Sequence, residues 1–199
     1  MQTIPLILAS ASPRRKLLLE QIGISFEIHP SQVAEPEYPG GDPVKYALSL
    51  AELKAADISN IYPHALVVGA DTIVVVDDAV LGKPVDPTSA ENMLKLLSNR
   101  THQVVTAYSI QHRFLDIQLD RHVSTQVRFK PLAEDEIKRY IKSGAPFDKA
   151  GAYGIQDYSG VFVDRIEGCF YNVVGFPLSD FHTALKELLT KHQLTIYPG

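Results

Sequence analysis

One carboxylate interrupts the most apolar stretch of the chain. Asp71 is the only charged residue between Ala65 and Val76. A carboxylate in such surroundings is costly unless a metal, a cation or hydrogen-bond donors compensate it. An Asp that caps its own turn at a strand end is the alternative, but the length of the flanking apolar run favours a functional group. Gly69 and Ala70 lack bulk, so another group can approach the backbone beside Asp71.

The segment Ser-Ala-Ser-Pro-Arg-Arg, residues 10–15, has the composition of a phosphate site. Ser12 is a good N-cap and Pro13 suits the first helical position, so we expect a helix to start here. Unpaired N–H groups at a helix N-terminus attract anions. Arg14 and Arg15 oppose the helix dipole unless an anion docks. Together with the Ser10 and Ser12 hydroxyls they predict phosphate binding. A solvated basic turn is the alternative, and the segment is not a Walker A loop.

Two lysines and a glutamate are weaker candidates when each is taken alone. Lys54 falls on the apolar face of a helix predicted to open at Asp42-Pro43, where a lysine either snorkels or meets an anion. Lys83 lies in Gly-Lys-Pro after a short strand, which is more typical of a surface turn. Glu35 lies in an exposed loop, where it is either a metal ligand or a solvated acid.

Residues 148–156 form an unusual loop. Two glycines allow close approach to a ligand, while Asp148, Lys149, Tyr153 and Gln156 offer polar groups. A plain connector is the alternative. Several cations combined with a few carboxylates indicate a polyphosphate site with Mg²⁺, because hard cations prefer oxygen ligands; the cations are Arg14, Arg15, Lys54, Lys83 and Lys149, and the carboxylates are Glu35, Asp71 and Asp148.

Elements that could position these residues alternate irregularly along the chain. The patterns predict helices opening at residues 13, 42 and 86, another around 137–141 and a last one around 181–189. Strands are predicted at 6–9, 26–28, 66–76, 102–110, 115–119 and 123–129, and a hairpin at 161–174 turns at Glu167-Gly168-Cys169. Adjacent strands are too frequent for a purely parallel sheet, so we expect a mixed α/β or α+β fold with one long sheet.

Composition excludes several classes of protein. The 199 residues carry a net charge of −4, with 45% hydrophobic and 21% charged residues, which is typical of a globular domain and not of a disordered chain. The acidic balance disfavours a nucleic-acid-binding protein. No apolar run is long enough to span a membrane or to form a signal peptide. The lone Cys169 suits a reducing cytosol, and the seven histidines show no zinc spacing.

The motifs, in their order and spacing, resemble the Maf family of nucleoside triphosphate pyrophosphatases. The matching segments are residues 10–15, 69–72, 82–84, 100–106, 148–156 and 174–178. The resemblance implies a mixed α/β fold related to inosine-triphosphate pyrophosphatases, with residues 1–199 forming a single domain of two lobes around a central cleft. It also implies cleavage between the α- and β-phosphates with a divalent metal, Mg²⁺ or Mn²⁺.

The resemblance also implies roles for single residues. Arg14, Thr72 and Gln156 look like the branch that acts on dTTP and UTP. In this reading Ser10, Ser12, Asp148 and Lys149 complete the substrate site, Glu35 and Asp71 hold the metal, and catalysis depends on Asp71, Lys54, Lys83 and Arg15. Ala34 stands where the family often has an acid, which weakens the metal role of Glu35.

The sequence leaves other functions open. The same fold could hydrolyse another nucleotide, or the protein could be a nucleotide-binding regulator of septum formation without turnover. We expect a cytoplasmic protein whose partner is the nucleotide, with neither nucleic acid nor membrane as a partner, and a homodimer stays open.

Overall fold

The computed structural model describes residues 2–197 and divides them into two compact units. Unit 1 takes the residues up to Asp71, Thr106–Val123 and the residues from Gly175 on; unit 2 takes Thr72–Val105 and Ser124–Val174. Three strands contribute residues to both units: β4 (Leu66–Val76), β6 (Thr101–His112) and β7 (Ile117–Phe129). Among residues 2–197 there is no helix with the length and apolar character needed to cross a bilayer.

The main sheet contains both parallel and antiparallel strand pairs. The order is β3-β2-β4-β6-β7-β8, with β5 paired to β4, and the further strands are β2 (Leu6–Leu8), β3 (Glu27–Ile28), β5 (Ala79–Leu81) and β8 (Val163–Glu167). β2 pairs parallel with β3 and β4, whereas the β4–β5 and β7–β8 pairs are antiparallel. The predicted mixed α/β class with one long sheet is therefore confirmed.

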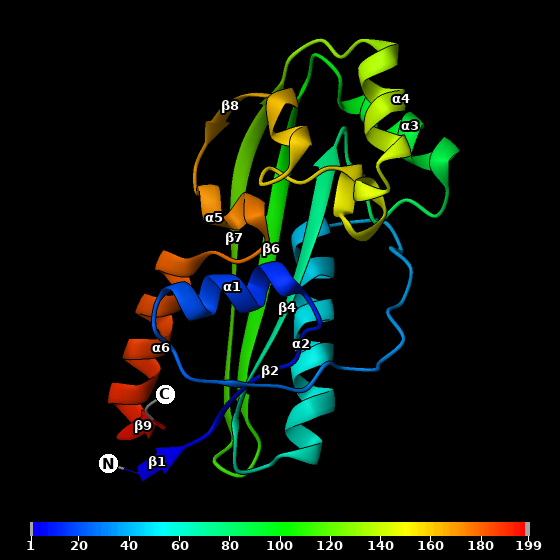
Figure 1. The fold of residues 1–199 in the computed structure, drawn as a ribbon. Helices are drawn as coiled ribbons and strands as arrows, with labels where there is room; N and C mark the ends of the chain where they lie inside the picture. Colours follow the sequence, from blue (N-terminus) through cyan, green and yellow to red (C-terminus); the bar gives the residue numbers. More distant parts are fainter. Residues whose placement is uncertain (1, 198–199) are drawn as a thin grey trace. The chain divides into compact units, whose positions relative to one another are not determined.

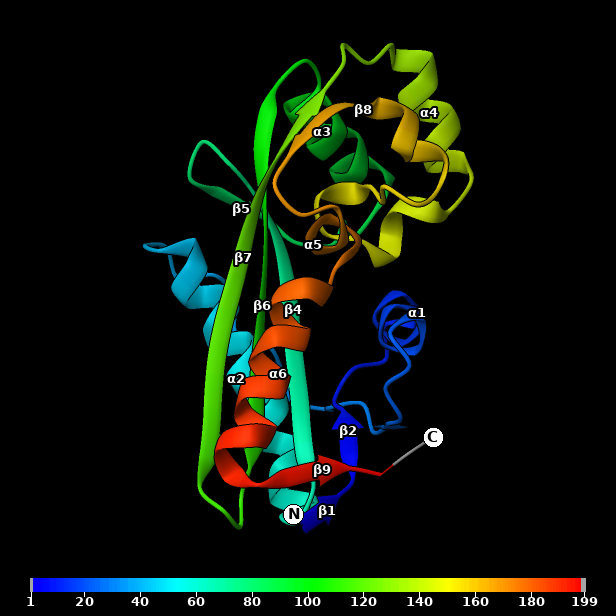
Figure 2. The ribbon, with the colours of Figure 1, turned by 90° about the vertical axis from the view of Figure 1, so that its left-hand side faces the viewer.

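Unit 1 has three helices: α1 (Pro13–Gln21), α2 (Pro43–Ile61) and α6 (Leu178–His192). Figure 1 shows α2 lying along β4, and an apolar cluster of Ile7, Ala55, Ile58 and Val67 packs β2, β4 and α2 together. A parallel pair of β1 (Gln2–Ile4) and β9 (Leu194–Ile196) joins the two ends of the described chain (Figure 2). Each of these strands has only three residues, which is too few for a recognisable strand pattern in the sequence.

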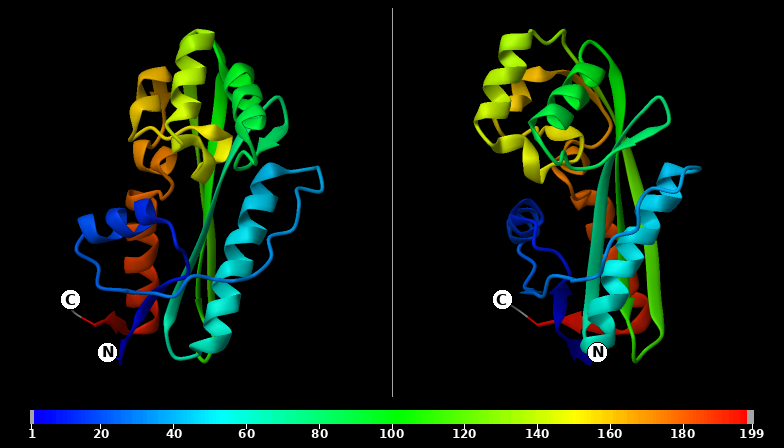
Figure 3. Two further views of the ribbon diagram at one scale, coloured as in Figure 1. Left: turned by 45° about the vertical axis from the view of Figure 1, so that its right-hand side comes forward. Right: turned by 90° about the vertical axis from the view of Figure 1, so that its right-hand side faces the viewer.

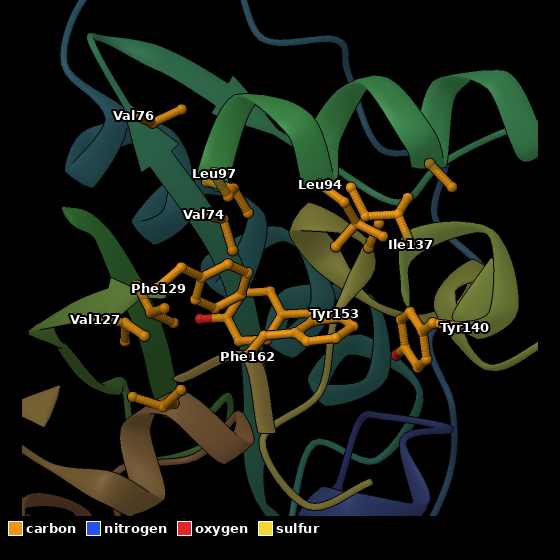
Figure 4. Packing of buried hydrophobic residues seen from close by; sticks show 14 residues of the cluster. Val74, Val76, Leu94, Leu97, Val127, Phe129, Ile137, Tyr140, Tyr153 and Phe162 are labelled. Atoms are coloured by element: carbon orange, nitrogen blue, oxygen red, sulfur yellow. The ribbon is translucent and has the colours of Figure 1, made fainter. Parts of the chain in front are cut away.

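Unit 2 has α3 (Pro87–Leu97), α4 (Glu134–Lys142) and α5 (Phe170–Val174). Three short 3₁₀ turns, η1 (Ala145–Asp148), η2 (Ala150–Ala152) and η3 (Tyr158–Phe162), lie between α4 and β8. Tyr153, Phe129 and Phe162 lie at the centre of its core, where their rings meet edge to face (Figure 4).

Two of the sequence predictions are wrong in detail. Residues 115–119 and 123–129 are not two strands, because 117–129 is the single strand β7. Residues 170–174 form the helix α5 and not the second strand of a hairpin. The Asn172 amide donates to the Val104 carbonyl and to Thr125 Oγ1, both at 2.9 Å. This buried bonding overrides the strand preference of the β-branched and aromatic residues in the segment.

Candidate active site

A half-buried cation lies between two carboxylates in unit 1. Lys54 Nζ is 2.6 Å from Asp71 Oδ1 and 2.9 Å from Glu35 Oε1. Asp71 is 9% exposed and lies in the middle of β4. Of the metal, cation or hydrogen-bond donors expected to compensate Asp71, the structure shows a cation, and the alternative of a strand-end cap is wrong. Of the two outcomes considered for Lys54, the structure shows that it meets an anion.

Close packing of α2 against β4 makes this contact feasible. A Cβ atom built on Gly69 would lie 2.3 Å from the Ala51 carbonyl oxygen and 2.5 Å from the Ala55 nitrogen. Residues 69 and 71 lie on the same face of the strand, because side chains alternate along it. The group that approaches the backbone beside Asp71 is therefore α2, which brings Lys54 to the carboxylate.

Glu35 lies in the segment between β3 and α2, which runs alongside α2 to the start of that helix (Figure 3). Ser31 Oγ and the Gln32 N–H donate to Asp57 Oδ2 at 2.7 and 3.1 Å. Further along, the Tyr46 hydroxyl donates to the Pro36 carbonyl at 2.9 Å. The sequence does not indicate the roles of Asp57 and Tyr46, because a polar side chain on a helix carries no signal of which segment it anchors.

Arg15 is fixed at the start of α1. Its Nε donates to the Gly175 carbonyl and its Nη1 donates to Ser10 Oγ, both at 3.0 Å. Ser12 Oγ accepts the Arg15 N–H, which confirms the predicted N-cap. Ser10 thus supports a guanidinium that is 9% exposed, and Arg14 is half-buried beside it.

Burial dominates the electrostatics of this cluster. It raises the pKa of Asp71 above its ordinary value, although Lys54 and Arg15 act to lower it. Burial lowers the pKa of Arg15, while Asp71 acts in the opposite direction. Burial also raises the pKa of Tyr46, and Asp71 and Glu35 add to that effect. The charges of the cluster therefore act on one another at short range.

Two carboxylates that converge on one cation have the chemistry of a hard-metal site. Glu35 and Asp71 supply oxygen donors of the kind that Mg²⁺ prefers, and Mg²⁺ commonly takes one or two carboxylates and completes its shell with water and phosphate oxygens. Residues 2–197 contain no cluster of three or more histidines, cysteines or acids that could hold a metal. As oxygen donors, Glu35 and Asp71 are chemically suited to a hard divalent cation.

The remaining predicted residues belong to unit 2. Lys83 is exposed and extended after β5, and its neighbour Gly82 accepts a hydrogen bond from the Gly151 N–H at 3.0 Å. A Cβ on Gly151 would lie 2.9 Å from Val74 Cγ2, so this loop packs against β4. Thr72 shares a strand face with Val74. Unit 2 therefore brings the segments of Thr72, Lys83 and the 148–156 loop together.

Within the 148–156 loop, the polar residues have different surroundings. Gln156 is exposed, whereas Lys149 contacts Asp148 and Asp157. The Tyr153 hydroxyl is 2.8 Å from Nε2 of the buried His102. Unit 1 contains Ser10, Ser12, Arg14, Arg15, Glu35, Lys54 and Asp71, and unit 2 contains Thr72, Lys83, Asp148, Lys149 and Gln156.

Comparison with known proteins shows similarity along nearly the whole chain. A family model described as Maf-like protein matches residues 5–188. The dTTP/UTP pyrophosphatase of Ruminiclostridium cellulolyticum is 46% identical over 187 residues, which cover 94% of this chain and 97% of that protein. The dTTP/UTP pyrophosphatase of Symbiobacterium thermophilum is also 46% identical, over 98% of this chain and 97% of its own.

A similar fold occurs in a solved structure. A HAM1 protein from Coxiella burnetii aligns with a TM-score of 0.51 at 15% identity, over 93% of this chain and 100% of that one. At this identity the likeness shows the fold alone, and it supports the mixed α/β architecture.

Proposed function

This chain belongs to the Maf family, and on that premise we propose that it hydrolyses dTTP and UTP to the nucleoside monophosphate and pyrophosphate. The observation that carries the proposal is the half-buried Lys54 ammonium between Asp71 and Glu35, because this cluster joins a cation suited to phosphate to two carboxylates suited to a metal. The names of the relatives that are 46% identical support the choice of substrate.

Cations and N–H groups would bind the triphosphate. Arg14, Arg15 and Lys54 of unit 1 and Lys83 of unit 2 are proposed to neutralise the phosphate charge. The Ser10 hydroxyl and the Gly175 carbonyl already hold the Arg15 guanidinium, so little side-chain entropy is lost when it meets an anion. The Ser12-capped start of α1 adds the partial positive charge of its N–H groups.

Asp71 is the proposed proton acceptor. The oxygen of a water molecule attacks the α-phosphorus, the bond from the α-phosphorus to the bridging oxygen breaks, and pyrophosphate leaves with that oxygen. The attacking water gives its proton to Asp71. Burial raises the pKa of Asp71, which makes its carboxylate a stronger base at neutral pH than an exposed Asp.

Glu35 and Asp71 are the residues proposed to hold Mg²⁺ or Mn²⁺. Such an ion, when bound, neutralises phosphate charge and lowers the pKa of a coordinated water.

Gln156 and Thr72 are proposed to select the base. The Gln156 amide has a donor for O4 and an acceptor for N3–H of uracil or thymine. Its exposure in the loop leaves the amide accessible to a ligand. Modified pyrimidine triphosphates share this edge, so removal of unwanted nucleotides from the pool is the proposed cellular role.

A panel of nucleoside triphosphates, assayed for pyrophosphate release with and without EDTA, tests the function. We expect dTTP and UTP to be the best substrates, EDTA to abolish turnover, and Mg²⁺ or Mn²⁺ to restore it. Asp71→Asn serves as the inactive control. Full turnover in excess chelator would contradict the metal role of Glu35 and Asp71. Tight binding of nucleotide without pyrophosphate release would instead favour the regulator.

A further inference from the structure

Gln156 lies in a tight turn that we call the Gln156 turn, residues 154–157. The Asp157 N–H donates to the Gly154 carbonyl at 3.2 Å, which closes the turn and leaves Ile155 and Gln156 at its corners. A side chain on such a corner can read a base only if the turn itself is held still. Groups that fix the two ends of this turn therefore control the position of Gln156.

Lys149 contacts both ends of the Gln156 turn. A Cβ atom on Gly154 would lie 2.6 Å from Lys149 Cε and 2.7 Å from Cδ, so the lysine stem crosses directly over the first residue of the turn. The ammonium of the same lysine is 3.2 Å from Oδ2 of Asp157, the last residue. One side chain thus covers the turn and forms an ion pair with its end.

The three N–H donors of the Lys149 ammonium have three acceptors inside the protein. Nζ donates to the Ala145 carbonyl at 2.5 Å and to Asp148 Oδ1 at 2.6 Å, in addition to its pairing with Asp157. The lysine side chain is 12% exposed. An ammonium has three donors and no acceptor. Acceptors within the protein therefore satisfy all three N–H donors of the Lys149 ammonium, and no phosphate is needed to do so.

Asp157 connects the end of the Gln156 turn to other elements of unit 2. Its Oδ1 accepts from the Ser159 N–H at 2.8 Å and from the Ser159 hydroxyl at 2.6 Å. The Tyr140 hydroxyl of α4 donates to the same carboxylate at 3.3 Å. The end of the turn is thus tied both to η3 and to α4, which are regular elements of unit 2.

We propose that Lys149 is a positioning residue that clamps the Gln156 turn through Gly154 and Asp157, and that it thereby sets the choice of base. This inference rests on the proposed function, in which Gln156 reads the base. It replaces the expectation that Lys149 contacts the substrate. A contact to phosphate and a clamp on the turn make different kinetic predictions, because every nucleotide has the same triphosphate and only the base differs.

Lys149→Met tests the clamp, because it removes the ammonium and keeps an unbranched stem over Gly154. We expect kcat/KM for UTP to fall and the ratio of kcat/KM for UTP to that for CTP to fall by about tenfold, the scale of one misplaced buried polar contact. Gly154→Ala tests the same clamp without a change of charge, since its methyl group must push the lysine stem aside. It should shift the ratio in the same direction. Lys142→Met, at an exposed lysine of α4, is the matched control.

Hydrogen exchange at residues 150–158 provides a readout that does not depend on turnover. Both test variants should exchange faster there than the parent, by about tenfold, and Lys142→Met should not. Equal loss of kcat/KM for UTP and CTP with unchanged exchange would overturn the clamp and make Lys149 a phosphate contact. If the parent releases no pyrophosphate from UTP, the proposed function fails, whereas the exchange arm still decides whether Lys149 fixes the turn.

Discussion

Lys54 Nζ and Asp71 Oδ1 are 2.6 Å apart, but removal of one residue leaves the other in a different electrostatic environment than the reverse. Asp71→Asn leaves Lys54 paired with Glu35, and it removes a carboxylate whose charged form burial disfavours. We expect turnover to fall by about 10²–10⁴, because the proton acceptor is lost. The melting temperature should hold or rise. A lower melting temperature with near-parent turnover would show that Asp71 is structural.

Lys54→Met should have the opposite effect on stability. It removes the nearest cation of the Asp71 carboxylate, and the loss of one partner of a buried ion pair costs about 3 kcal/mol or more. We expect a lower melting temperature at pH 7, measured beside the Asp71→Asn variant. Equal melting temperatures of Lys54→Met and Asp71→Asn would contradict the expectation that only the loss of the lysine destabilises the protein. Lys95→Met, which removes an exposed i,i+4 ion pair with Glu91, should change stability little.

Gln156→Glu tests base recognition. The variant keeps the size of the side chain but has no N–H group for O4 of uracil or thymine. We expect kcat/KM for dTTP and UTP to fall by at least about tenfold, the scale of one mispaired polar group. Steady-state kinetics with both substrates checks this. Unchanged kinetics would place base recognition elsewhere in the 148–156 loop.

At the level of residues, the sequence predicts single candidates better than their partners. Asp71 stands out because a charge in an apolar strand needs compensation, and Lys54 stands out on an apolar helix face. That Glu35 meets the same lysine depends on Asp57 and Tyr46, which anchor an irregular segment to α2. Such anchors depend on tertiary structure, so no local pattern indicates them.

At the scale of elements, the contact of α2 with β4 depends on Gly69. Gly69→Ala places a methyl group 2.3 Å from a carbonyl oxygen of α2, and backbone atoms there cannot move aside without shifting the helix. We expect a loss of about 1–3 kcal/mol of stability, as for other overpacked sites, and a fall in turnover because Lys54 moves away from Asp71. Urea unfolding and pyrophosphate release check both effects. Gly82→Ala, where the added carbon meets no atom within 4 Å apart from its chain neighbours, is the control for stability.

Helix starts were the most predictable feature among the elements. Ser12, Asp42 and Asp86 each accept a backbone N–H of the helix that they open. Caps of this kind involve residues only two or three positions apart, so the sequence contains the whole interaction. The helix α5 could not be predicted in this way, because its Asn172 bonds to Val104 and Thr125, which are distant in the chain.

At the scale of the whole molecule, the mixed sheet was predictable from the frequency of adjacent strands. The strand order was not, since β2 pairs with both β3 and β4 and thus joins segments separated by about 20 to 60 residues along the chain. The core of unit 2 also contains a polar group, whose burial no pattern in the sequence indicates. His102 is 2% exposed, and its ring meets Phe129 edge to face.

His102 should make the protein sensitive to acid. Burial lowers the pKa of His102 from 6.5 to about 4, because its charged form is disfavoured in the core. A lowered pKa means that the unfolded chain binds the proton first as the pH falls. The stabilising contribution of neutral His102 is therefore complete above pH 6.5 and is lost progressively between pH 6.5 and about 4.

The size of this effect can be isolated with His102→Gln, whose amide keeps a polar group near the Tyr153 hydroxyl. From pH 7 to pH 5 the parent should lose about 2 kcal/mol more unfolding free energy than the variant, since each unit of pKa difference corresponds to about 1.4 kcal/mol. Urea unfolding at both pH values measures the difference, with the exposed His122→Gln as control. Because the carboxylates titrate equally in parent and variant, their contribution cancels. Parallel pH dependence in the parent and His102→Gln would mean that His102 has the same pKa in the folded and the unfolded protein, and that burial does not lower it.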